Sequence, residues 1–108
     1  MSHDMDRVAA LFRSRRGEIA NFIDALKTSQ VLENSANDLY FQALFNLGVL
    51  EYGIDRRKFA AALVKSLNEP RSVVAAWIEG NFLPACSYRG TIIRVITAML
   101  EEKLAHVQ

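Results

Sequence analysis

The sequence predicts an all-α protein that folds as one compact domain of five helices. Apolar residues recur three and four positions apart along nearly the whole chain, and the alternating apolar and polar pattern of a half-buried strand is absent. Both prolines, Pro70 and Pro84, stand late in the chain, next to expected helix ends. A length of 108 residues with 51% hydrophobic and 23% charged residues suits one domain with its own core.

The composition argues against several classes of protein. The longest apolar runs are short or interrupted by charge, so we expect no membrane span, and Asp4 and Asp6 do not suit a secretion signal. The only cysteine, Cys86, excludes an internal disulfide, and His3 and His106 stand at opposite ends of the chain, so no metal site is expected. The sequence shows no catalytic triad pattern and no glycine-rich phosphate loop. We therefore expect a cytoplasmic protein that is not an enzyme and needs no cofactor.

The first expected helix runs from Asp6 to about Thr28. Its apolar residues follow a three and four spacing that Arg15 interrupts, and they are Met5, Val8, Phe12, Ile19, Phe22 and Leu26. This face suits either the seam of a two-helix contact between two copies or packing on the chain's own domain. We expect a homodimer held partly by this helix. The polar stretch "TSQVLENSAND" is expected to end the pattern.

The second and third expected helices have clear boundaries. The second runs from Asn37 or Asp38 to Tyr52 and stops at Gly53. The third begins at Asp55, an N-cap residue, and the preceding Ile54 can close over Phe59 as a hydrophobic staple. The sequence Asn68–Glu69–Pro70 ends it, because proline disfavours helical geometry in the residue before it.

The fourth expected helix lies in the stretch "RSVVAAWIEGNFLP", residues 71–84. Val73 or Val74, together with Trp77 and Ile78, are expected to face inward, and Gly80 suits the left-handed position that ends a helix. The fifth helix is expected from about Ser87 to Ala105. Its inward residues are Ile92, Ile93, Ile96, Met99, Leu100 and Leu104.

Charge is unevenly distributed along the chain. The net charge is only +1, but residues 53–94 contain seven basic and three acidic residues and therefore carry +4. Such a segment can form a basic surface for a polyanion, or it can be a fluctuation of charge over solvated helix faces. The motifs in the same segment bear on this choice.

Two stretches, "LFNLGVLEYGIDRRKFAAAL" and "VAAWIEGNFLP", have characteristic residues at a family spacing. The residues in question are Leu44, Leu47, Gly53, Ile54, Asp55, Phe59, Ala60, Val74, Trp77, Gly80 and Pro84. Their order resembles that of the Cro/lambda-repressor-like (XRE-type) helix-turn-helix domain, over about residues 44–100. The resemblance implies such a domain in residues 37–108, with residues 1–36 as an extra N-terminal helix for packing or dimerisation.

The resemblance also implies a set of residues that contact DNA. Arg56 and Arg89 take places that face phosphates in the family, and we expect Arg94 to contact phosphate as well. Arg71 and Ser72 stand at the start of the implied recognition helix, where Arg71 suits a bidentate contact to guanine. Ala75 or Ala76 can lie against a thymine methyl group.

The chain departs from the family pattern in two ways. About four residues are added between Leu63 and Val74, so either the third helix is longer or the turn after it is wider. The outward positions of the implied recognition helix are mostly alanine, which offers little hydrogen bonding to base edges.

Two functions therefore remain open. One is a small DNA-binding transcriptional regulator that reads the major groove of double-stranded DNA with residues 71–79. The other is a protein-interaction module, an adaptor or anti-activator, that keeps the fold without base readout.

Cys86 also has two interpretations. It stands just ahead of the fifth expected helix, where the helix N-terminus can lower the pKa of a thiol and make it a redox sensor. A cysteine also packs well as a small buried residue, and we favour this second interpretation.

Overall fold

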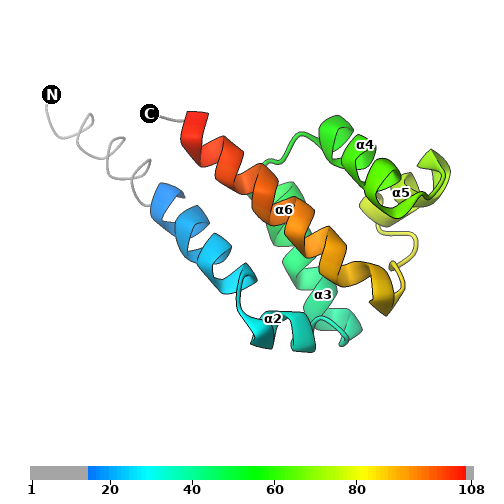
Figure 1. Cartoon of the computed structure of the whole chain (residues 1–108), viewed down its shortest axis with the longest axis horizontal. Coiled ribbons are helices and arrows are strands. Elements are labelled where there is room, and N and C mark those ends of the chain that lie inside the picture. Colours follow the sequence, from blue (N-terminus) through cyan, green and yellow to red (C-terminus); the bar gives the residue numbers. More distant parts are fainter. Residues whose placement is uncertain (1–14, 107–108) are drawn as a thin grey trace, which may run out of the picture.

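The computed structural model describes residues 15–106, and the regular secondary structure of this part of the chain consists of helices, with no strand (Figure 1). Residues 15–26 form an N-terminal helix. The later elements are α2 (Ser29–Asn34), α3 (Asp38–Asn46), the π-helical turn η1 (Leu47–Glu51), α4 (Arg56–Leu67), α5 (Arg71–Ile78) and α6 (Cys86–His106). The all-α prediction is confirmed. The prediction of five helices is wrong, because the described residues form six when η1 is counted with α3.

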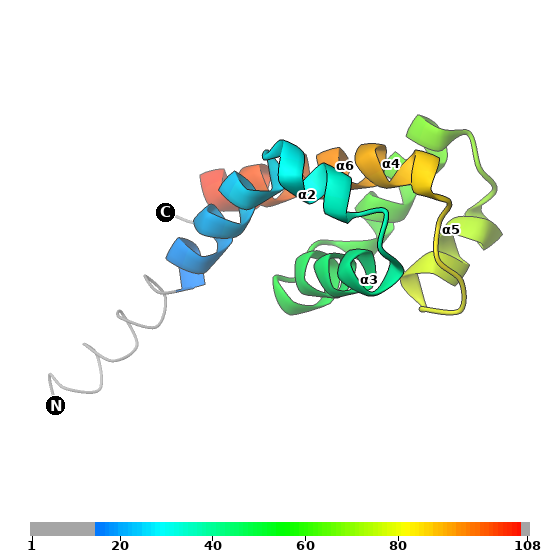
Figure 2. The same ribbon diagram turned by 90° about the horizontal axis from the view of Figure 1, so that it is seen from below.

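The long helix α6 runs through the middle of the molecule. The N-terminal helix and α2 lie along one side of it, and α4 and α5 lie on the other (Figure 1). In the view turned by 90°, α3 lies below α6 and α2 (Figure 2). α6 contacts α2, η1 and α4, while α5 packs against α4. The α4 and α5 pair is therefore attached to the rest of the molecule mainly through α4.

Every helix contributes to one hydrophobic core. Ile19 of the N-terminal helix and Val31 of α2 belong to the same cluster as the later helices. The largest fully buried side chains are Phe41, Phe59, Leu63, Ile92, Ile93, Ile96, Leu100, Val49 and Val74. The described part of the N-terminal segment therefore shares its core with residues 37–106.

The seam of the N-terminal helix packs on the chain's own domain. Ile19, Phe22 and Leu26 are buried, and the Phe22 ring lies 5.3 Å from the Tyr52 ring. The Arg15 guanidinium also lies over the Tyr52 ring, 4.9 Å from its centre. For these residues the structure supports packing within the domain. Met5, Val8 and Phe12 lie outside the described residues.

A short helix, α2, occupies the stretch that was expected to be a break. Thr28 is its N-cap, and its hydroxyl oxygen accepts a hydrogen bond from the Val31 backbone N–H at 3.3 Å. Val31 is the only buried residue of α2. A helix of six residues with one inward side chain has no measurable periodicity, which explains why the hydrophobic pattern missed it.

The second expected helix changes from α to π geometry at Leu47. The Tyr52 backbone N–H bonds to the Leu47 carbonyl oxygen at 3.0 Å, a spacing of five residues. A Cβ atom on Gly48 would lie 2.8 Å from Cγ2 of Ile96 and 3.5 Å from Cε2 of Phe22. Glycine therefore lets η1 approach both α6 and the N-terminal helix.

The helices α4 and α5 are joined by three residues, Asn68, Glu69 and Pro70. Asn68 ends α4 in the left-handed conformation with φ +54°. Asp55 caps its start as expected, since its carboxylate accepts from the backbone N–H groups of Arg57 and Lys58 at 3.0 and 3.2 Å. Between Leu63 and Val74 the chain therefore has a long α4, up to Leu67, followed by a short turn.

Candidate nucleic-acid interface

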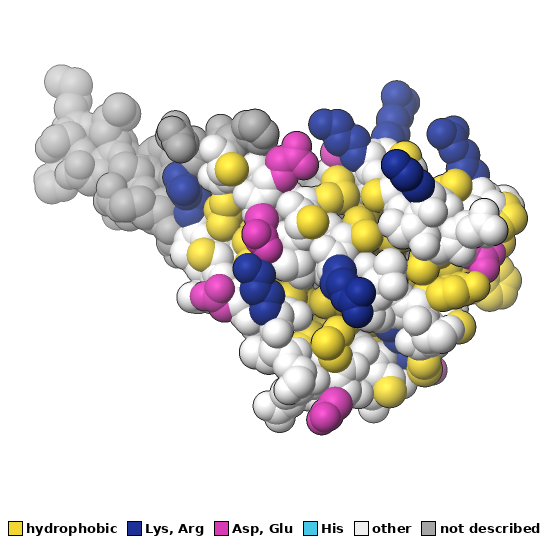
Figure 3. Space-filling model, in the orientation of Figure 1, with side chains coloured by type: hydrophobic (Ala, Val, Ile, Leu, Met, Phe, Trp, Pro, Cys, Tyr) yellow, Lys and Arg dark blue, Asp and Glu magenta, His cyan; other side chains and the backbone are white. Residues whose placement is uncertain are grey.

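Five exposed cations follow one another on α4 and α5. They are Arg56, Arg57, Lys58, Lys65 and Arg71, and we call this set the α4–α5 basic surface. Figure 3 shows blue side chains gathered at the upper right, over α4 and its surroundings. Between residues 56 and 78 the only acidic residue is Glu69. None of the five cations forms a salt bridge with a carboxylate of the described residues.

Three of these cations occupy the first turn of α4, where a positive charge is unfavourable. The N-terminus of a helix carries a partial positive charge, so cations there raise the energy of the free protein. Asp55 offsets part of this repulsion with its capping carboxylate. Arg56 and Arg57 of this turn form no salt bridge with a carboxylate of residues 15–106, and an anion bound there would relieve the repulsion.

A hollow lies between α4 and α5. It has a volume of about 380 Å³ and is lined by Arg57, Ala60 and Ala61 of α4 and by Arg71 and Ala75 of α5. The alanines leave the space open because they have no side chain beyond Cβ. Guanidinium groups from two helices can therefore bind a phosphate, while the methyl groups can contact a sugar or a thymine methyl group.

The burial of Val74 and Trp77 sets the outward face of α5. Trp77 is 6% exposed, as expected for an inward residue, and its ring lies 5.9 Å from the Tyr88 ring. The helix ends near Gly80, whose φ of +82° is left-handed. On the other face Arg71, Ser72 and Ala75 are exposed, and Ala76 is half-buried. The four residues predicted on α5 therefore lie in its first two turns, and three of them face solvent.

The prediction for Arg89 requires a correction. This residue was expected to contact phosphate, but it is buried, with only 3% of its surface exposed. Its guanidinium donates to the carbonyl oxygens of Pro84, Ser35 and Ala36 at 3.1, 2.8 and 3.2 Å, and to the Asp38 carboxylate at 2.8 Å. It also lies over the Phe41 ring at 5.0 Å. The donors of Arg89 are thus used to join three segments of the fold.

The remaining predicted residues lie in different places. Arg56 is exposed at the start of α4, within the basic surface. Arg94 is exposed on α6 and lines another hollow, together with residues of the N-terminal helix and α2. The structure therefore does not bring Arg94 into the hollow that holds Arg57 and Arg71.

Sequence reasoning did not single out Arg57, Lys58 or Lys65. A signal for Arg57 was present, because it stands three and four residues before Ala60 and Ala61 and therefore shares a helix face with them. Cys86 was expected to be buried and is exposed. Its thiol lies 3.9 Å from the Ala36 carbonyl oxygen, close to the corner that Arg89 holds.

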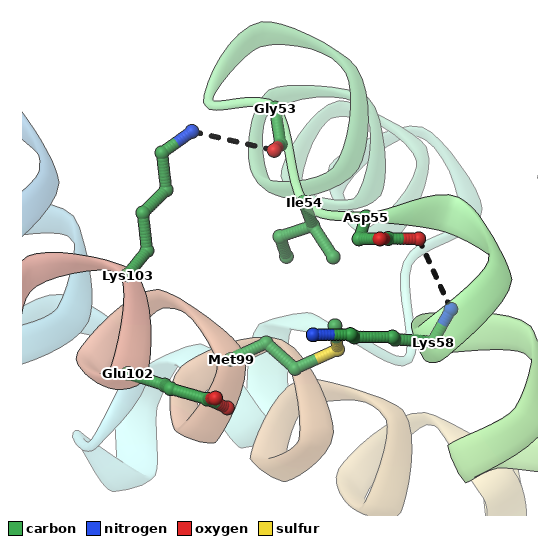
Figure 4. Close-up of a pocket in the computed structure, with 7 residues that line it drawn as sticks. All are labelled: Gly53, Ile54, Asp55, Lys58, Met99, Glu102 and Lys103. Carbon is green, nitrogen blue, oxygen red and sulfur yellow. Dashed lines mark hydrogen bonds between the residues drawn. The ribbon is translucent and has the colours of Figure 1, made fainter. Parts of the chain in front are cut away.

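A third hollow lies where η1 leads into α4 (Figure 4). The lysines that line it, Lys58 and Lys103, are matched by two carboxylates, Asp55 and Glu102. Lys103 points to the end of η1, where its ammonium donates to the carbonyl oxygens of Tyr52 and Gly53. The balanced charges and the use of Lys103 as a cap indicate a structural role for these residues.

Other classes of site find no support in the described residues. Between residues 15 and 106 no three His, Cys, Asp or Glu side chains are grouped so that they could hold a metal ion. None of the helices in that range has the length and apolarity that crossing a bilayer requires. Comparison with protein-family models, curated proteins and solved structures finds no match to this chain.

Proposed function

We propose that the protein is a small transcriptional regulator that binds double-stranded DNA through α4 and α5. In this proposal the two helices act as a helix-turn-helix pair of the XRE type, and α5 enters the major groove. The observation that carries it is the α4–α5 basic surface, a set of five exposed cations on two helices joined by three residues, none of them in a salt bridge with a carboxylate of residues 15–106. A polyanion supplies the missing negative charge.

Phosphate contacts supply most of the affinity in this proposal. Arg56, Arg57 and Lys65 bind the DNA backbone, because they are exposed on α4, the helix that packs against α5. Arg71 and Ser72 stand at the first turn of α5, where Arg71 forms a bidentate contact to guanine. Ala75 and Ala76 supply apolar contact to thymine. With one arginine and one serine as polar readers, discrimination between sequences is modest.

The experiment is fluorescence anisotropy with two DNA duplexes at several salt concentrations. One duplex carries the DNA that flanks the protein's own coding region, and the other has a random sequence. Binding weakens steeply with salt because each phosphate contact releases counterions. Arg56→Ala and Arg57→Ala each reduce the log–log salt slope by about one and weaken binding equally on both duplexes.

Arg71→Ala separates base readout from charge. It weakens binding to the preferred duplex by about 1–3 kcal/mol and has little effect on the random duplex. Lys27→Ala is the control, because Lys27 is an exposed lysine outside the basic surface and should leave the slope unchanged. Absence of binding to both duplexes at low salt would overturn the DNA proposal.

A protein-interaction module is the second candidate function. It is favoured by the two exposed apolar side chains that follow α5, Phe82 at 69% and Leu83 at 37% exposure. The alanines on the outward face of α5 suit a protein surface as well as they suit DNA. This function gains support if neither duplex binds and if the protein forms a stable complex with a partner protein. Phe82→Ser should then disrupt that complex, and Arg71→Ala should leave it unaffected.

A further inference from the structure

A hollow opens between α6, α2 and the N-terminal helix, and nothing within the described residues covers it. Its volume is about 430 Å³. Leu32 of α2 is 41% exposed at its edge, and Leu26 and Ile93 form part of its floor. Figure 3 views this side of α6, where hydrophobic side chains reach the surface between charged ones. The hollow thus combines an apolar floor with a charged rim.

The rim is formed on α6 by Arg94, Ala98 and Glu101. Their spacing of four and then three residues places them on one face of the helix. Arg94 forms no salt bridge with a described carboxylate, and Glu101 pairs with Lys27 at 3.2 Å. Both side chains of that pair are about half exposed, at 56% and 49%. A pair so exposed contributes little stability, so Glu101 stays available to another cation.

This face is complementary to itself. Arg94 lies about 6 Å before Ala98 along the axis of α6, and Glu101 lies about 4.5 Å after it, at a rise of 1.5 Å per residue. If two α6 helices pack antiparallel about Ala98, each Arg94 meets Glu101 of the partner subunit within about 2 Å of axial offset. Alanine at the centre permits the close approach of about 8–10 Å between helix axes that this pairing needs.

We propose that the face formed by Leu32, Arg94, Ala98 and Glu101 is the interface of a homodimer. Two copies pack their α6 helices antiparallel across a two-fold axis, which pairs each Arg94 with the partner's Glu101 and covers Leu32. A second copy fits because one surface supplies both members of every ion pair. The described seam of the N-terminal helix is already buried in its own domain and offers no alternative. The proposal goes beyond DNA binding and is independent of it.

Charge reversal tests the pairing directly, using sedimentation velocity and equilibrium at high micromolar concentration. Arg94→Glu places two acidic residues against each other twice across the two-fold axis, and Glu101→Arg does the same with two basic residues. Each variant alone should raise the Kd of the dimer at least about tenfold, because opposed like charges disfavour association. A mixture of the two variants should regain dimers. In a mixed dimer the introduced glutamate faces the introduced arginine, and the unchanged Glu101 of one subunit faces the unchanged Arg94 of the other.

The controls separate this interface from other effects. Lys65→Glu changes the same amount of charge on exposed α4 and should leave the dimer unchanged. Circular dichroism of each variant checks the fold, and all three positions are exposed. The proposal is overturned by a monomeric wild-type chain, which would leave the hollow to a different protein. It is also overturned by reversal variants that dimerise as well as wild type, or by a mixture that stays monomeric.

Discussion

The hydroxyl of Tyr88 in α6 donates a hydrogen bond to the carboxylate of Glu69, 2.6 Å away in the turn between α4 and α5. The Tyr88 ring also lies against Trp77, with 5.9 Å between ring centres. One residue of α6 therefore holds both the turn and the inward face of α5. This contact also draws the only carboxylate of residues 56–78 toward α6.

The Tyr88 contact predicts a dependence of stability on alkaline pH. The hydrogen bond to Glu69, followed by the negative charge of Glu69, raises the pKa of Tyr88 above its usual value of about 10. A raised pKa means that the contact contributes stability below about pH 10 and loses it as pH rises through the pKa of the folded state. Tyr88→Phe should therefore unfold more readily than wild type at neutral pH, and this difference should shrink above about pH 10.

Urea denaturation of both proteins between neutral and strongly alkaline pH measures this difference. Burial also raises the pKa of Tyr52, but Tyr52 is present in both proteins and cancels in the comparison. A stability difference that stays constant across the range would show that the Tyr88 hydroxyl does not act through its proton.

Trp77→Ala should cost about 3–5 kcal/mol of unfolding free energy, since it empties a large buried site. Phe82→Ala is the matched control. Phe82 is an aromatic residue at 69% exposure, so its removal should change stability by no more than about 0.5 kcal/mol. Both are measured by urea denaturation. A Trp77→Ala protein with normal stability that loses DNA binding alone would mean that Trp77 is a ligand contact.

Gly48→Ala and Gly90→Ala should change stability in opposite directions. At Gly48 a Cβ would meet Cγ2 of the buried Ile96 at 2.8 Å, and overpacking of this kind costs about 1–3 kcal/mol. At Gly90, in α6, a Cβ would meet nothing within 4 Å, so alanine should gain up to about 1 kcal/mol from helix propensity. Thermal and urea denaturation compare the two. Equal stabilisation by both would show that η1 moves readily away from α6.

Arg89→Ala should destabilise the fold by at least about 3 kcal/mol, because hydrogen bonds to charged groups contribute roughly 1.5–3 kcal/mol each. Arg89→Lys should recover only part of this loss, since an ammonium cannot reach acceptors on Pro84, Ser35 and Asp38 at once. The salt slope of DNA binding, measured at a temperature where the variants stay folded, should not change. A slope reduced by about one in a stable Arg89→Ala protein would restore the phosphate role.

Local sequence signals predicted most helix boundaries. Asp55 caps the start of α4, α4 ends before Pro70, and α5 ends just before the left-handed Gly80, as expected. A cap or a proline acts on backbone groups within one turn, so its effect can be read without knowing the fold. The same reasoning missed α2, where Val31 is the one buried residue.

The candidate site was only partly predictable for the same reason. Arg56, Arg71 and Ser72 are exposed where helical spacing places them outward. The hollow between α4 and α5 depends on how two helices cross, and the spacing of residues within one helix does not determine a crossing angle. Arg57 therefore joined the site only in the structure.

The sequence by itself determined that this chain forms helices, which faces of the longer ones are apolar, and that its basic residues concentrate between residues 53 and 94. Only the tertiary structure decided what each arginine does. Arg89 is buried because the carbonyl oxygens of Ser35, Ala36 and Pro84 meet at one point around its guanidinium. Ser35 and Ala36 stand more than fifty residues before Arg89 in the chain. Arg94, five residues later on the same helix, faces away from that point and stays in solvent. A guanidinium has the same charge and reach in both places, and the acceptors that surround it decide whether it is buried in the fold or left for a partner.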